Sequence, residues 1–137
     1  MDFTYKRVNR TFIERPIIPV TVRNPKNSRS NKYYALIDSG SDECIFDAEF
    51  GEALGIVIKS GNKRQLHGVI EGKTQPYWMH DIEIEVGGWP HKISAGFMYK
   101  LARNGYGVLG RAGFFDQFKS IKFEHRRGRI EIKRLDE

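Results

Sequence analysis

The sequence predicts a mainly β domain with two short helices. Apolar and polar residues alternate in residues 82–86 (IEIEV) and 130–132 (IEI), the pattern of strands with one buried face. Gly87-Gly88 follows the first segment and Arg127-Gly128 precedes the second, which is the turn chemistry expected at the ends of hairpins. The chain shows no regular alternation of strands and helices, so an α/β architecture is excluded.

Further strands are predicted at residues 17–22, 33–37, 63–67, 92–98 and 120–123. Pro16 and Pro19 place the first of these at the edge of a sheet or its margin, because proline cannot donate to a β ladder. Residues 24–31 (NPKNSRSN) are rich in turn formers and predict a loop.

Two short helices complete the predicted elements. Phe46, Phe50 and Leu54 recur at four-residue spacing, which predicts one helical face, and Gly55 suits the end of that helix. Residues 112–118 carry three phenylalanines after a turn bounded by glycines and predict the second helix.

Length and composition indicate one folded domain. The chain has 137 residues, of which 39% are hydrophobic and 29% charged, which is near the average for globular proteins and argues against disorder. Cys44 is the single cysteine, so an intrachain disulfide and a thiolate metal site are excluded. The four histidines are widely separated in the sequence, and we predict no metal site.

The sequence gives no sign of membrane insertion or export. No apolar stretch approaches the roughly 20 residues of a membrane span, and the first residues (MDFTYKRVNRTF) lack the apolar core of a signal peptide. A lone cysteine also fits a reducing compartment. We therefore expect a soluble, cytoplasmic protein without a membrane partner.

The net charge of +6 raises the question of nucleic-acid binding. Basic residues are spread along the chain, and the one dense cluster, residues 125–129 (HRRGR), lies between two predicted strands. A solvated hairpin turn explains this cluster better than a phosphate site does. We regard nucleic acid as an unlikely partner and keep a basic nucleic-acid-binding domain as a third alternative.

The tripeptide Asp38-Ser39-Gly40 is the most informative motif. Alone it is an ordinary turn sequence. Here the apolar run 33–37 (YYALI) leads directly into Asp38, which places its carboxylate at the end of a buried strand. About seventy residues downstream, Val108-Leu109-Gly110-Arg111 combines a short apolar strand with the start of a helix-like segment.

The joint pattern ALIDSGS, HGVIEGK and VLGRAGFFDQF resembles that of the retropepsin-like (retroviral-type) aspartic proteases, in order and spacing. The resemblance covers residues 13–133, which implies an N-terminal extension at 1–12 and a short tail at 134–137. It implies a retropepsin-like closed β domain that forms a homodimer. It also implies an aspartic endopeptidase that hydrolyses extended peptide or protein substrates without a cofactor.

The single Asp-Ser/Thr-Gly motif of the chain makes the homodimer necessary for this chemistry. Peptide hydrolysis of this kind needs two neighbouring carboxylates that share one proton, so that one acts as base toward water and the other as acid toward the carbonyl. Each protomer would therefore contribute its Asp38 as the catalytic residue.

The resemblance also implies roles for residues around Asp38. Ser39, Gly40 and Ser41 would form the active-site loop, with a Ser41 hydroxyl able to donate to the carboxylate. Gly40, Asp42 and Glu43 would line the substrate backbone, and Ile45 and Val108 would wall side-chain pockets. A flexible flap would comprise Gly68, Val69, Ile70, Glu71 and Gly72. An ion pair between Asp42 and Arg111 would support the loop near the dimer interface.

One further interpretation stays open at this point, and one further motif match does not. A non-proteolytic peptide-binding or dimerisation module on the same fold would carry the same motifs. Residues 105–110 also satisfy G-x-G-x-x-G, the dinucleotide-binding fingerprint, but that motif should follow a strand at the start of a βαβ unit. We interpret this match as a coincidence.

Overall fold

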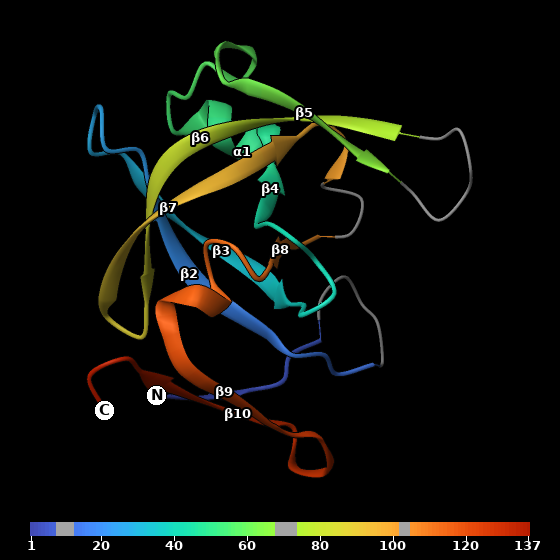
Figure 1. Ribbon diagram of the computed structural model, residues 1–137, viewed down its shortest axis with the longest axis vertical. Helices are drawn as coiled ribbons and strands as arrows, with labels where there is room; N and C mark the ends of the chain where they lie inside the picture. Colours follow the sequence, from blue (N-terminus) through green and yellow to red (C-terminus); the bar gives the residue numbers. More distant parts are fainter. Residues whose placement is uncertain (8–12, 68–73, 102–104) are drawn as a thin grey trace.

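The computed structural model describes residues 1–7, 13–67, 74–101 and 105–137, and it is built mainly of strands (Figure 1). The strands are β1 (Asp2–Thr4), β2 (Ile17–Arg23), β3 (Ser30–Ile37), β4 (Ile45–Asp47), β5 (Asn62–His67), β6 (Thr74–Val86), β7 (Trp89–Met98), β8 (Gly107–Leu109), β9 (Phe118–Glu124) and β10 (Arg129–Arg134). One α-helix, α1 (Ala48–Ala53), and the short 3₁₀ turns η1 (Ile58–Ser60), η3 (Phe115–Gln117) and η4 (His125–Arg127) connect them in the described ranges. The predicted mainly β class is confirmed.

The larger of the two sheets that the described strands form is closed on itself. Its strand order is β2-β3-β8-β4-β7-β6-β5, and β2 also pairs with β6 from Thr21 to Arg23. The short strand β8 therefore lies between β3, to which it is parallel, and β4, to which it is antiparallel. This insertion brings the loop between β3 and β4 next to the chain that follows β8.

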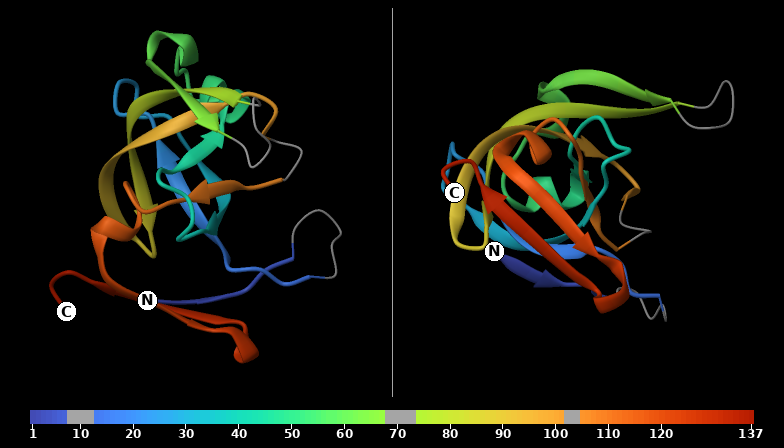
Figure 2. Two further views of the ribbon diagram at one scale, coloured as in Figure 1. Left: turned by 45° about the vertical axis from the view of Figure 1, so that its right-hand side comes forward. Right: turned by 60° about the horizontal axis from the view of Figure 1, so that its bottom comes forward.

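The three remaining strands form a separate small sheet with the order β1-β10-β9, which makes its own layer along one side of the closed sheet (Figure 2). Phe3, Ile130 and Phe123 are aligned across it, so they share one face. The α-amino group of Met1 donates to the Ile132 carbonyl at 2.8 Å. The segment predicted as an N-terminal extension thus contributes a paired strand.

The main core lies inside the closed sheet and contains several fully buried aromatic rings. Phe46, Phe97 and Phe114 have no exposed surface, and the rings of Phe46 and Phe97 meet edge to face at 6.0 Å. Helix α1 packs closely against this pair, because a Cβ on Gly51 would lie 2.7 Å from the Phe97 ring. A large side chain at position 51 therefore has no room.

The first predicted helix begins later than its apolar spacing indicated. Phe46 belongs to β4, whose residues are all buried, and the helix starts at Ala48 with Asp47 as its N-cap. A strand buried on both faces gives an unbroken apolar run, which the four-residue spacing of Phe46, Phe50 and Leu54 imitates. Gly55 adopts a φ of +81° and ends the helix as predicted.

The prediction of a second helix at residues 112–118 was wrong. Gly113 has a φ of +100°, which interrupts a right-handed helix, and only the 3₁₀ turn Phe115–Gln117 forms. Phe114 and Phe118 are held instead by burial, with ring centroids 5.1 Å apart. Tertiary packing has decided the conformation of this segment.

The predicted strands are confirmed, several of them with greater length. The predicted loop is shorter than 24–31, since Ser30 and Asn31 already belong to β3. Pro19 lies in the part of β2 that precedes its pairing with β6, which agrees with a position at the sheet margin. Gly87 and Gly88, with φ of +57° and +88°, make the turn between β6 and β7.

The basic cluster at residues 125–129 forms the turn between β9 and β10, as predicted, with Gly128 in the left-handed conformation. No helix in the described ranges combines the length and the hydropathy that a membrane-spanning helix requires.

Candidate active site

Asp38 directly follows β3 and is fixed by backbone hydrogen bonds on both sides. Its peptide N–H donates to the Leu109 carbonyl of β8 at 3.0 Å, and its carbonyl accepts from the Ser41 N–H at 3.1 Å. The Gly40 N–H donates to the Asp38 carboxylate oxygen Oδ1 at 2.8 Å. The side chain is partly buried. The turn thus orients the carboxylate while leaving it in reach of solvent.

The loop after Asp38 is braced by the segment that follows β8. Arg111 N–H donates to the Ser41 carbonyl and Ala112 N–H to the Asp42 carbonyl, both at 2.9 Å. A Cβ at Gly110 would collide with the backbone of Ser41 and Glu43. Glycine is required at position 110 for this close approach of two backbones.

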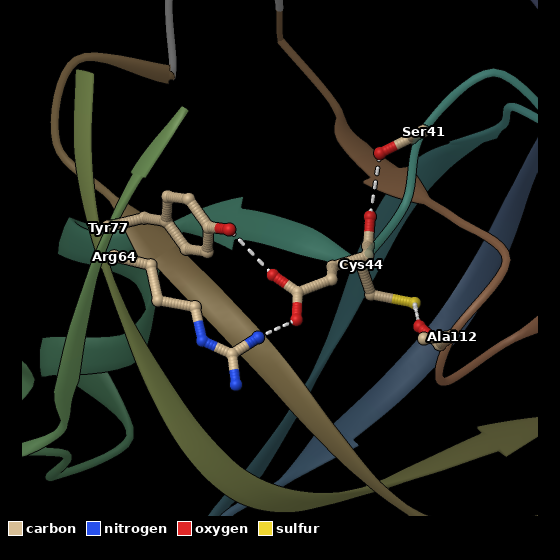
Figure 3. Close-up of polar contacts among 6 residues, drawn as sticks. Ser41, Cys44, Arg64, Tyr77 and Ala112 are labelled. Atoms are coloured by element: carbon tan, nitrogen blue, oxygen red, sulfur yellow. Dashed lines mark hydrogen bonds and ion pairs between the residues drawn. The ribbon is translucent and has the colours of Figure 1, made fainter. Parts of the chain in front are cut away.

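The predicted contact between the Ser41 hydroxyl and the Asp38 carboxylate is not made. Ser41 Oγ donates to the Glu43 carbonyl at 2.7 Å instead (Figure 3). Serine side chains commonly form hydrogen bonds with nearby backbone groups in turns, and Ser41 makes such a bond in place of one to Asp38. Ser39 and Gly40 are exposed, so the tip of the loop is free to meet another molecule.

The predicted ion pair between Arg111 and Asp42 is present, with Arg111 Nη2 bound to Asp42 Oδ1. The Asp42 side chain is 84% exposed and the Arg111 side chain 61% exposed in the single chain. The pair is therefore largely exposed to solvent in the single chain. The role of this pair at a dimer interface stays a prediction.

The Glu43 carboxylate, predicted to line the substrate backbone, is bound by two side chains from the β5–β6 hairpin (Figure 3). Tyr77 Oη donates to Glu43 Oε2 at 2.6 Å, and the Arg64 guanidinium binds Glu43 Oε1. Burial of the phenol and its hydrogen bond to the carboxylate raise the pKa of Tyr77 to about 12. Tyr77 therefore remains a hydrogen-bond donor over the whole physiological range.

Ile45 and Val108, predicted to wall substrate pockets, are direct cross-strand partners between β4 and β8. Ile45 is 5% exposed and belongs to a second apolar cluster with Tyr77 and Met98, separate from the main core. Val108 packs on this cluster and is partly exposed. The two residues thus lie on the same face of the sheet, where Val108 is partly exposed and Ile45 is almost fully buried.

Cys44 lies between the Asp38 loop and β4 and has a structural role. Its thiol has no exposed surface and donates to the Ala112 carbonyl at 3.7 Å. Burial raises the pKa of this thiol to about 12. Cys44 therefore helps to join the loop to the segment after β8 and is not a nucleophile at neutral pH.

Several sequence predictions fall outside this cluster. The predicted flap residues 68–72 lie outside the described residues, and β5 and β6 on either side of them pair in antiparallel fashion. The glycine motif at 105–110 does not open a helix, because Gly107–Leu109 is strand β8. Nowhere in the described ranges do three His, Cys, Asp or Glu side chains gather as metal ligands.

Sequence reasoning missed Arg64 and Tyr77 as residues of the site. Arg64 lies in the predicted strand at residues 63–67, and Tyr77 lies in the part of β6 that was not predicted. Neither residue belongs to a recognisable motif. Their approach to Glu43 depends on the register of β5 with β6, which no local signal in the sequence specifies. A surface cavity of about 670 Å³ borders Arg64 and Met79 but none of the other residues named in this subsection, and we assign it no role.

Comparisons with known proteins identify the fold of the chain. No protein-family model and no curated protein matches the chain. Among solved structures, it is similar to a retropepsin-like aspartic protease from Rickettsia conorii, with a TM-score of 0.66, 16% identity, and coverage of 96% of this chain and 89% of the other. It is also similar to EIAV protease in complex with the inhibitor HBY-793, with a TM-score of 0.50, 20% identity, and coverage of 76% and 88%. The chain has the retropepsin-like fold.

Proposed function

We propose that the chain is one protomer of an aspartic endopeptidase. The observation that carries the proposal is the placement of Asp38 within the retropepsin-like fold. Its carboxylate stands at the end of β3, is oriented by the Gly40 N–H at 2.8 Å, and lies in a loop braced by the chain after β8. An exposed loop tip with the partly exposed Val108 on the neighbouring strand suits the binding of an extended peptide.

The chemistry would use two Asp38 carboxylates, one from each of two copies. Like-charge repulsion opposes ionisation of both groups, so the pair holds one proton over a range of acidic pH. The ionised carboxylate then takes a proton from the attacking water, and the neutral one donates its proton to the carbonyl oxygen of the peptide. No metal or cofactor takes part in these steps.

The second copy would dock along β9. In the described part of the chain, β9 pairs with β10 on one side and with no strand on the other. Ile121 is partly buried and Phe123 is 40% exposed on the apolar face of this edge strand. An open strand edge with apolar side chains is suited to pairing with another strand, and the Asp38 site is incomplete without a second copy.

The proposed dimer can be tested apart from activity. We expect Phe123→Asp to shift the protein from dimer to monomer in sedimentation at micromolar concentration. Val57→Asp is the matched control, because Val57 is 72% exposed and lies before η1, away from β9. Equal dimerisation of wild type and Phe123→Asp would contradict the β9 surface.

The substrate would lie against Gly40 and Asp42, with its side chains near Val108 and Ile45. The decisive experiment is incubation of the protein with a mixed peptide library at acidic pH, with and without a transition-state mimic of peptide hydrolysis. Cleavage that the mimic blocks and that Asp38→Asn abolishes is the expected result. Binding of peptides without cleavage would instead support the non-proteolytic peptide-binding module.

A further inference from the structure

Three side chains connect the active-site loop to the β5–β6 hairpin. Arg64 of β5 and Tyr77 of β6 are direct cross-strand partners, so their side chains emerge on the same face of the hairpin. Each binds a different oxygen of the Glu43 carboxylate, Tyr77 at 2.6 Å (Figure 3). The register of the hairpin thus aims two donors at one acceptor.

Both ends of this connection are held firmly. The Glu43 side chain is only 16% exposed, and its carbonyl accepts from Ser41 Oγ at 2.7 Å. The Tyr77 ring is 8% exposed and packs in the second apolar cluster with Ile45. Hydrogen bonds to a charged group in such a partly desolvated place are stronger than those in water.

The connection lies where the hairpin leaves the closed sheet. Pairing between β6 and β7 begins at Trp78, opposite Phe97, while residues 74–77 of β6 pair with β5 alone among the described strands. The hairpin extends beyond the rest of the sheet from this point (Figures 1 and 2). Contacts at Tyr77 therefore lie at the base of the projecting part.

We propose that Glu43, Arg64 and Tyr77 form a clamp that couples the position of the β5–β6 hairpin to the Asp38 loop. Glu43 is then a positioning residue and not a direct contact to the substrate backbone. The clamp exists in the free protein, and only its effect on turnover rests on the proposed function. Release of the clamp frees the described part of the hairpin, and its formation ties that part to the loop that carries Asp38.

Hydrogen exchange in the free protein tests the clamp without any assay of activity. We expect Tyr77→Phe, Arg64→Met and Glu43→Gln each to raise exchange in residues 62–66 and 74–77 about tenfold, the effect of losing one charge-assisted hydrogen bond. Exchange in β9 and β10 should not change. Tyr77→Phe removes a single oxygen and keeps the ring, so it reports on the clamp even if Glu43→Gln folds poorly.

A matched control comes from the other end of β6. Glu83 forms an ion pair with Arg23 at 3.8 Å, and its side chain is 26% exposed. Glu83→Gln removes a comparable carboxylate from β6, the strand that also carries Tyr77. It should leave hydrogen exchange in residues 62–66 and 74–77 at the wild-type rate. Unchanged exchange in all three clamp variants, or an equal increase in Glu83→Gln, would overturn the proposal.

A double-mutant cycle separates positioning from substrate contact. If Glu43 acts through the clamp, Glu43→Gln and Tyr77→Phe change kcat and KM alike, and the double variant is no worse than either single variant. If Glu43 contacts the substrate, Glu43→Gln alone raises KM, and the effects add, which would contradict the proposal. Absence of cleavage by the wild-type protein would refute the peptidase function, whereas the exchange data would still decide on the clamp.

Discussion

Arg111 and Asp42 form an ion pair across the junction between the active-site loop and the chain after β8, beside a backbone bond of 2.9 Å from Ala112 N–H to the Asp42 carbonyl. The backbone bond keeps the two segments together whether or not the ion pair forms. Because both side chains are exposed in the single chain, the pair contributes only about 0–1 kcal/mol to its folding.

Burial of this pair between two copies would change its importance. Arginine binds a carboxylate through a planar fork that lysine lacks, and a buried pair that loses one partner costs about 3–5 kcal/mol. We expect Arg111→Lys to leave thermal unfolding of the protomer unchanged but to weaken the dimer, with activity that recovers at higher protein concentration. Wild-type dimerisation and turnover in this variant would contradict a role for the Arg111–Asp42 pair at the dimer interface.

Asp38→Asn should abolish cleavage and preserve the fold. The amide is nearly isosteric with the carboxylate and its oxygen still accepts from the Gly40 N–H, but it cannot act as a base. We expect a loss of about 10³-fold or more in kcat, with a change of about 1 kcal/mol or less in unfolding free energy. Peptide cleavage and chemical denaturation measure the two quantities. Substantial turnover by the variant would rule out Asp38 as the catalytic residue.

The rate of cleavage should peak at acidic pH, where the two Asp38 carboxylates share one proton, and fall as the second carboxyl ionises. Since the Ser41 hydroxyl donates to the Glu43 carbonyl and not to Asp38, Ser41→Ala should leave the position of the peak unchanged. A rate that rises steadily from neutral into alkaline pH would contradict the mechanism. A shift of the peak in Ser41→Ala would show that the hydroxyl reaches the carboxylate in the dimer.

Gly110→Ala should disrupt the active site through steric conflict. The added Cβ would meet backbone atoms of Ser41 and Glu43, which cannot rotate away as a side chain would. Overpacking of this kind costs about 1–3 kcal/mol, and here it displaces the loop that carries Asp38. We expect a lower melting temperature and a disproportionate loss of activity. Gly88→Ala is the control, because no atom lies within 4 Å of its Cβ and only its turn geometry is strained.

The Cys44 thiol should resist alkylation at about pH 8. It should also lower the unfolding free energy of the protein at alkaline pH. Burial raises the pKa of its thiol from 9.0 to about 12, so the folded protein keeps the proton while the unfolded chain loses it. The unfolding free energy therefore falls as pH rises from about 9 toward 12, and is unaffected by this group below that window. Cys44→Ala should reduce this alkaline loss when melting temperatures are compared. Rapid labelling of the native protein by iodoacetamide would contradict the buried position.

Local sequence determined most of the strands and the location of the candidate site. Alternation in residues 82–86 and 130–132, and the glycines at 87, 88 and 128, depend on side-chain periodicity and backbone freedom that each segment carries by itself. Asp38 was identifiable because an apolar strand leads directly into it. Gly110 was part of the same motif, and its close approach to the loop supplies the physical reason.

Tertiary structure alone decided the features that depend on distant partners. Phe46 is in a strand and not a helix because β4 is buried between β7 and β8. Residues 112–118 do not form a helix because Phe114 and Phe118 are buried in the core. Glu43 binds Arg64 and Tyr77, which lie 21 and 34 positions away in the chain. Such contacts are set by strand register and packing, which a linear pattern of residues does not encode.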